Sequence, residues 1–186
     1  MAVTFNPSGI LKTAVFIITK PVDFFRQMPK TGGYFDPLIF VIIFGMLSGI
    51  IQLAINAIQY GPLVDFSATI GSIIFMPLVV ALFSFIGAAI LYLIWSLMGS
   101  KEDFEAAYRG AAYLSALSPI TTIIGLIPYL GTIVSLLIGL YYTVIVSIEV
   151  HSIPAKKAWL VFGVLTAIIG ILSLMSTFAM RNLSVK

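Results

Sequence analysis

The chain has 186 residues, of which 60% are hydrophobic and 9% are charged, and its mean hydropathy is +1.13. A soluble domain carries about 25% charged residues, so this composition excludes a soluble fold and predicts a membrane protein. The net charge of +3 comes without a clustered basic patch, which excludes nucleic acid as a partner. The absence of cysteine excludes disulfides, thiolate metal sites and a cysteine nucleophile.

Residues 1–37 form the first of three predicted parts, an N-terminal arm. Between Pro7 and Lys30 apolar residues recur at roughly helical spacing, and four cations interrupt them: Lys12, Lys20, Arg26 and Lys30. This segment is too charged to cross a bilayer, but its basic and aromatic mix suits an amphipathic helix in the interface. Pro21 should divide it into two pieces. We expect its cations to attract anionic lipids.

Five mostly apolar segments follow, each near the ~20 residues that a helix needs to cross a bilayer. They cover about Leu38–Gln59, Ile70–Met98, Gly110–Ile127, Tyr129–Val150 and Ala158–Met180. The predicted fold class is all-α: a polytopic membrane protein with five transmembrane helices in residues 38–180 and a short tail, 181–186. The second segment is long, so it either tilts or loses its first turns at Pro77.

The orientation follows from the positive-inside rule. If the segments cross in turn, eight lysines and arginines fall on the side of the arm and two, Arg181 and Lys186, on the other. The N-terminus is therefore expected in the cytoplasm and the C-terminus outside.

A charged island, Lys101 to Arg109, separates the second and third segments. Ser100 is expected to be a helix N-cap with Asp103 closing a capping box, and Glu105 and Arg109 share a helix face at i, i+4. The island is either a solvated helix start or part of a docking site. The candidate inner docking face comprises Lys20, Arg26, Lys30, Lys101, Glu105, Arg109 and His151.

Polar residues within the apolar segments should face protein or a cavity, because lipid cannot hydrogen-bond to them. The candidates are Gln52, Asn56, Gln59, Tyr113, Ser118, Pro119, Tyr142 and Glu149. They indicate either helix packing or one polar cavity, and Pro119 should kink its helix. Glu149 and His151 either handle protons or lie hydrated in the headgroup layer. Gly45 and Gly49 form a GxxxG pattern, which alone is weak evidence for dimerisation.

No catalytic chemistry is predicted. The chain has one histidine, and it contains neither HExxH nor GxSxG. We therefore expect no enzyme, no catalytic residues, no cofactor and no metal.

Several local patterns follow one another along the five predicted spans. They are GGYFDP at 32–37, FE at 104–105 with Arg109, AY at 112–113 running to SP at 118–119, IPYLG at 127–131, and Glu149 to His151 followed by KA at 157–158. In this order they resemble the Yip domain family, named for Ypt/Rab-interacting proteins, and the resemblance covers approximately Pro21 to Trp159.

The resemblance implies a non-enzymatic, multi-pass protein of the secretory or plasma membrane. Eukaryotic relatives are associated with Rab GTPases, vesicle biogenesis and membrane shaping, but the short arm here is more similar to a prokaryotic member, expected in the cytoplasmic membrane. The expected function is a membrane-organising or partner-binding scaffold, with anionic lipids, other membrane proteins or a second copy in a homo-oligomer as partners. The alternative is a small transporter, channel or lipid-translocating protein that uses a polar intramembrane cavity.

Overall fold

The structure is all-α. The computed structural model describes the backbone of residues 7–61 and 66–184 and the side chains of residues 9–59, 61 and 75–176. The helices are α1 (Pro7–Thr19), α2 (Pro21–Gln27), α3 (Phe35–Tyr60), α4 (Phe66–Leu97), α5 (Phe104–Tyr113), the 3₁₀ turn η1 (Leu114–Leu117), α6 (Ser118–Ile124), α7 (Leu130–Glu149) and α8 (Ala155–Ser184).

Four helices are long and apolar enough to cross a membrane. The candidate spans are Phe35–Gln59, Phe75–Leu97, Leu130–Glu149 and Ala155–Ser176. They correspond to the first, second, fourth and fifth predicted segments. Because length and apolar composition are local properties of a sequence, these four predictions are confirmed within a few residues.

The third predicted span, Gly110–Ile127, is not one continuous helix. The helix begins earlier, at Phe104, and passes through η1 before α6 ends at Ile124. Pro119 stands in the first turn of α6 and has no N–H to continue the ladder from α5. The predicted irregularity at Pro119 is thus confirmed, and it takes the form of a 3₁₀ turn between two α-helical pieces. We call α5, η1 and α6 together the segmented helix.

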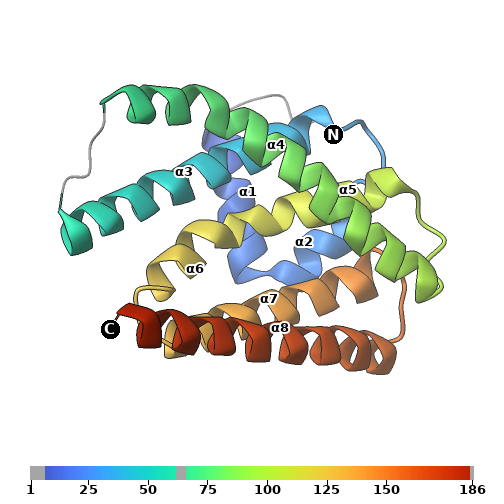
Figure 1. Ribbon diagram of the computed structural model, residues 1–186. Helices are drawn as coiled ribbons and strands as arrows, with labels where there is room; N and C mark the ends of the chain where they lie inside the picture. Colours follow the sequence, from blue (N-terminus) through green and yellow to red (C-terminus); the bar gives the residue numbers. More distant parts are fainter. Residues whose placement is uncertain (1–6, 62–65, 185–186) are drawn as a thin grey trace.

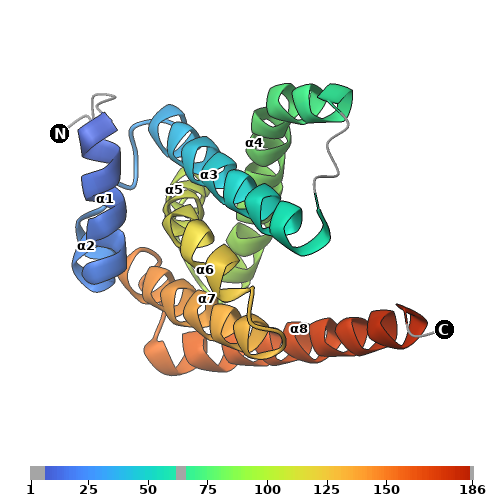
Figure 2. The ribbon, with the colours of Figure 1, turned by 90° about the vertical axis from the view of Figure 1, so that its left-hand side faces the viewer.

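The segmented helix lies at the centre of the bundle. It packs against α3 along its length, against α4 through α5 and against α7 through α6. Figure 1 shows it between α4 and α8, and α7 and α8 form an antiparallel pair. The helices α4 and α8 approach each other where α4 ends and α8 begins, and they diverge toward the opposite end (Figures 1 and 2).

Glycines allow the closest of these contacts. A Cβ on Gly45 would lie 2.8 Å from Val80, and one on Gly49 would lie 2.9 Å from Met76. The GxxxG pattern of α3 is therefore used inside the chain, against α4. Pro77 bends α4 without breaking it, as Figure 1 shows in the curve of that helix.

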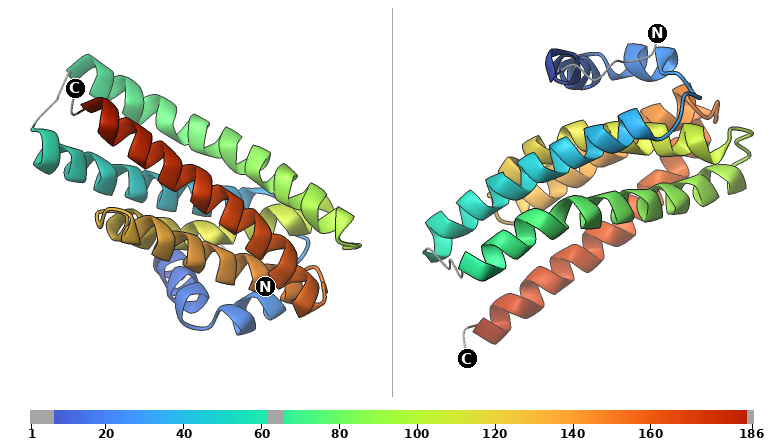
Figure 3. Two further views of the ribbon diagram at one scale, coloured as in Figure 1. Left: turned by 60° about the horizontal axis from the view of Figure 1, so that its bottom comes forward. Right: turned by 90° about the horizontal axis from the view of Figure 1, so that it is seen from above.

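The N-terminal arm divides at Pro21 as predicted, with α1 ending at Thr19 and α2 beginning at Pro21. The helix α1 runs across the long helices rather than along them (Figures 2 and 3). It packs on η1 and α2, and α2 packs on α7. Ala14 and Ile17 of α1 are buried against the bundle.

Candidate functional site

Two linkers lie at one end of the bundle, residues 98–103 between α4 and α5 and residues 150–154 between α7 and α8. We call this the linker end. Most of the charged side chains singled out in the sequence gather here, but they bind other parts of the same chain. Their arrangement is best described as two networks.

The first network, the arm clamp, holds the N-terminal arm on the bundle through Arg26, Lys30, Glu102, Glu105, Arg109 and Glu149. Its centre is Arg109, only 4% exposed, which donates from Nε to the carbonyl of Pro29 (2.7 Å) and from Nη1 to the carbonyl of Gly33 (2.8 Å). Glu105 accepts the N–H of Gly33 at 2.7 Å. Arg109 and Glu105 thus bind both sides of one short backbone segment.

Gly32 and Gly33 have the backbone conformation that this clamp requires. Their φ angles are 125° and 87°, which L side chains rarely adopt. A Cβ on Gly32 would also lie 3.6 Å from Nη1 of Arg109. The glycine pair therefore turns the chain so that Arg109 and Glu105 can reach its peptide groups.

Two ion pairs complete the arm clamp. Arg26 of α2 faces Glu149 at the end of α7 in a two-point contact, with Nε–Oε2 at 2.9 Å and Nη2–Oε1 at 3.2 Å. The hydrogen bond and charge of Glu149 raise the pKa of Arg26. Lys30 contacts Glu102 at 2.8 Å. Arg26 and Lys30, two cations of the candidate docking face, are therefore paired with carboxylates of the same chain.

Tyr142 and Tyr113 support the arm from within. The Tyr142 hydroxyl donates to the carbonyl of Ile18 at 2.9 Å, which satisfies a backbone acceptor near the C-terminus of α1. The ring of Tyr113 makes edge contacts with Phe24 of α2 and Phe40 of α3, with centroids 5.2 and 5.1 Å apart. Both residues were candidates for a polar cavity, and both fix the arm instead.

The second network joins the two linkers through Trp95, Ser100, Ser147, His151 and Lys157. The imidazole of His151 stacks on Trp95 at 4.0 Å between centroids, and its Nδ1 lies 2.8 Å from the Ser100 hydroxyl. Trp95 Nε1 donates to Ser147 (2.8 Å), and Lys157 Nζ donates to the carbonyl of Met98 (2.9 Å). Burial lowers the pKa of His151 from 6.5 to about 4, with Glu102 opposing the shift and Lys30 adding to it.

The predicted capping box is wrong. Helix α5 begins at Phe104 with Asp103 at the cap position and no side-chain cap hydrogen bond. Ser100 instead accepts the N–H of Glu102 at 3.2 Å and binds His151. The local sequence allows Ser100 either to cap a helix or to bind a side chain that is distant in sequence. In the structure its hydroxyl binds His151.

The polar residues of the apolar segments were expected either to pack helices together or to line one cavity, and within the described residues they do not gather at one place. Gln52, Asn56 and Gln59 are exposed on the half of α3 away from the linker end, and Gln52 Nε2 donates to Asn56 Oδ1 at 2.9 Å along the same helix. Glu149 lies at the opposite end of the bundle with Arg26. Ser118 and Pro119 lie in the segmented helix between them.

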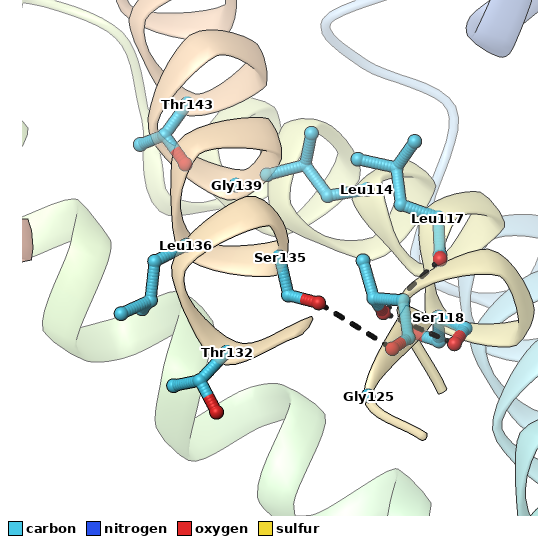
Figure 4. Close-up of a pocket in the computed structure, with 10 residues that line it drawn as sticks. Leu114, Leu117, Ser118, Gly125, Thr132, Ser135, Leu136, Gly139 and Thr143 are labelled. Carbon is cyan, nitrogen blue, oxygen red and sulfur yellow. Dashed lines mark hydrogen bonds between the residues drawn. The ribbon is translucent and has the colours of Figure 1, made fainter. Parts of the chain in front are cut away.

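Two grooves flank the segmented helix. One, of about 450 Å³, lies between α6 and α7. Leucines and glycines line it together with hydroxyl side chains such as Ser118, Thr121 and Ser135 (Figure 4). The other, of about 480 Å³, lies between η1 and α4. Leu114 and Ser118 line both. Sequence reasoning marked Ser118 but missed the grooves, because their opposite walls come from different helices.

Threonine hydroxyls satisfy the carbonyls near the irregular turn. Thr121 Oγ1 approaches the carbonyls of Leu117 (3.2 Å) and Ser118 (3.1 Å), and Thr122 donates to that of Ser118 at 2.8 Å. The sequence suggests Ser115 for this task, but its hydroxyl has no partner among the described residues and lines the groove beside α4.

These features fit one family. The Yip1 domain model matches residues 15–177, nearly the whole chain. The chain belongs to the Yip1 domain family. The recognition based on the sequence patterns is thus confirmed, and this Yip1 domain is a multi-pass helical integral membrane protein of a generally non-enzymatic family. No curated protein and no solved structure matched the chain. Among the described residues no group of three or more histidines, cysteines or carboxylates is placed to bind a metal.

Proposed function

We propose that this Yip1 domain is a membrane-organising scaffold whose clamped arm occupies one leaflet beside the bundle. The main support for this proposal is the arm clamp, in which Arg109 and Glu105 bind the segment that joins the arm to α3. In the clamped arm, α1 lies across the spans (Figure 3). An amphipathic helix in the interface adds area to one leaflet only. Because the arm clamp holds that helix beside the spans, the extra area stays in the leaflet next to the protein.

In this proposal the linker end faces the cytoplasm. Lys101 and Lys156, which lie exposed beside the clamp, favour that side under the positive-inside rule. The segmented helix adds a crossing to the four candidate spans, which makes five. Its two ends, Phe104 and Ile124, lie toward opposite ends of the bundle (Figure 1). The N-terminus is then cytoplasmic and the C-terminus lies outside, in the cytoplasmic membrane if the source is prokaryotic.

The scaffold also has a surface for partner helices. Gln52, Asn56 and Gln59 form an exposed amide row on α3, whereas Gly45 and Gly49 are already covered by α4. Amides exposed to lipid gain from hydrogen bonds across a helix interface. We place the contact with a second copy or another membrane protein on this row.

The scaffold proposal is tested by reconstituting the full chain into vesicles at increasing protein density and measuring their diameters by electron microscopy. We expect the wild type to shift the diameters. The double variant Glu105→Gln with Arg109→Gln should reduce the shift, because it releases the 29–33 segment. Lys101→Gln, at the same end but outside the clamp, is the matched control.

Two outcomes would contradict this function. The wild type would leave vesicle diameters unchanged at every density, or the clamp variant would act as strongly as the wild type while its arm is cleaved faster by added protease.

A second function, lipid translocation or transport, is favoured by the grooves beside the segmented helix. The helix is irregular where the grooves meet at Ser118, and Gly139 in the wall of one has open space beyond its Cα. In proteoliposomes, Gly139→Leu should fill the groove and lower the flux of labelled lipid, ions or solutes. Glu149→Gln and Asn56→Leu, both away from the grooves, serve as controls. An absence of flux in the wild type would remove this candidate and leave the scaffold.

A further inference from the structure

The arm carries four cations, and the structure divides them into two kinds. Arg26 contacts Glu149, and Lys30 contacts Glu102. Lys12 and Lys20 of the α1 region are exposed, and their ammonium groups have no hydrogen-bond or ion-pair partner among the described residues. The charge available to an external ligand on the arm is thus that of Lys12 and Lys20.

These two lysines border a shallow cleft on the outer side of α1. The cleft has a volume of about 400 Å³ and is lined by Leu11, Lys12, Val15, Phe16, Thr19 and Lys20. Eight residues along a helix span ~12 Å, so the lysines stand about two turns apart with apolar side chains between them. The Thr19 hydroxyl is satisfied by the carbonyl of Val15 at 2.7 Å, which leaves the ammonium groups as the polar chemistry of the cleft.

The apolar surface of the cleft is unusually open for a helix that packs on a bundle. Leu11 is 65% exposed and Val15 50%, whereas Ala14 and Ile17, on the opposite face of the same helix, are buried. Cations that border an exposed apolar surface are complementary to a molecule that has an anionic head and an aliphatic body. Figure 3 shows α1 running across the long helices, and in the proposed function the exposed face of α1 lies against lipid.

We propose that this cleft is a binding site for an anionic phospholipid, with Lys12 and Lys20 contacting the phosphate region and Leu11 and Val15 contacting the acyl chain. The inference rests on the proposed function, since it requires α1 to lie in the leaflet. It goes further because it assigns the preference for anionic lipids to Lys12 and Lys20. It excludes Arg26 and Lys30, whose charges are paired with Glu149 and Glu102. Soluble phosphate is not the ligand, because it would leave the apolar stripe uncovered.

The site is tested by brominated-lipid quenching of a tryptophan placed in the cleft. The reporter is the full chain with Phe16→Trp and Trp159→Phe, which leaves the buried Trp95 as a constant background. In nanodiscs, brominated phosphatidylglycerol should quench Trp fluorescence more strongly than brominated phosphatidylcholine at equal mole fraction. A preference of about fivefold per lysine is expected from the interaction of one cation with an anionic surface.

The double variant Lys12→Gln with Lys20→Gln should abolish this preference. The matched control, Lys101→Gln with Lys156→Gln, removes two exposed cations elsewhere and should keep it. Equal quenching by both lipids in the parent reporter would overturn the lipid site and leave the scaffold function standing. A preference that survives the Lys12 and Lys20 changes would do the same.

Two further results distinguish a failure of the site from a failure of the scaffold function. If neither brominated lipid quenches the reporter, α1 does not lie in the leaflet, and the scaffold function falls together with the site. If glycerol 3-phosphate in the buffer competes with phosphatidylglycerol, the ligand is a soluble phosphate and the proposed lipid site is wrong. All of the changed side chains lie outside the core clusters, and Phe16→Trp keeps an aromatic ring beside Phe24.

Discussion

Arg109 is the residue on which the attachment of the arm depends most. It is buried, and its two hydrogen bonds join backbone carbonyls nearly 80 residues away in sequence. We expect Arg109→Ala to lower the free energy of unfolding by about 2–4 kcal/mol, because two carbonyls lose a charged donor. Arg109→Lys should recover only part of this, since one ammonium cannot reproduce the planar fork.

The measurement is thermal unfolding in detergent followed by circular dichroism, with Lys101→Ala as the exposed control. A wild-type melting temperature for Arg109→Ala would show that the arm is held by its apolar contacts alone.

His151 predicts a pH dependence of stability. Its pKa is lowered by burial to about 4 in the folded chain, against 6.5 for the free group. Between these values the unfolded chain binds the extra proton, so stability rises with pH through this window and is lost as the pH falls from about 6.5 to about 4. The loss at pH 4 should be on the order of 3 kcal/mol.

The test compares the wild type with His151→Asn, which keeps a polar atom near the position of Nδ1 for Ser100 but does not titrate. Carboxylates such as Glu102 and Glu149 titrate in both proteins, so the difference between the two curves isolates the histidine. Parallel curves from pH 7 to pH 4 would mean that His151 accepts its proton without unfolding the linkers.

At the residue scale, the sequence predicted how side chains are arranged along one helix, but it did not predict which distant residues they contact. Glu105 and Arg109 were correctly placed on one helix face, at a spacing that allows them to pair. In the structure both bind the 29–33 segment, and the ion pairs among the described residues do not include this one. Helical spacing fixes which side chains point the same way, but tertiary packing decides what they meet.

At the scale of elements, the turn between α6 and α7 leaves the least room for a side chain among the described glycines, at Gly131. A Cβ on Gly131 would collide with the backbone carbonyl of Ile124, which cannot move without opening the turn. Gly131→Ala should therefore cost at least about 2 kcal/mol in the free energy of unfolding.

Gly163 in α8 provides the contrast, because a Cβ added there would have nothing within 4 Å. Gly163→Ala should be neutral or stabilise the helix by up to about 1 kcal/mol through propensity alone. Thermal unfolding of the two variants, side by side, checks the pair. Equal melting temperatures for the two variants would indicate that the turn at Gly131 relaxes more freely than its geometry suggests.

The same scale shows why four spans were predictable and the segmented helix was not. Hydropathy over about 20 residues identifies a span without any knowledge of its neighbours. Pro119 correctly indicated an irregularity, but the 3₁₀ turn lies upstream of it, at Leu114–Leu117, where the sequence itself carries no helix breaker. We attribute the position of the break jointly to Pro119 and to the packing of η1 against α3 and α1.

At the scale of the whole molecule, the segmented helix decides the topology. If it crosses, Lys101 and Lys156 lie on the cytoplasmic side, and Leu126, exposed after α6, lies outside. The chain has no cysteine, so single Lys101→Cys, Lys156→Cys and Leu126→Cys variants can be labelled without background. A membrane-impermeant maleimide applied to intact cells should modify the Leu126 variant alone. If the Lys101 variant is labelled together with the Leu126 variant, both residues lie on the same side. The segmented helix would then not cross, and four crossings would remain.

The divergence of α4 and α8 away from the linker end has a consequence for shape. Without its arm, the bundle is wider toward the diverging ends of α4 and α8 than at the linkers, and in the orientation proposed above this wide end lies in the outer monolayer. The arm does not cover the wide end: α2 packs on α7, and α1 packs on η1, the middle part of the segmented helix. Detaching the arm would therefore leave the taper of the long helices as the main asymmetry that the protein presents to the two leaflets.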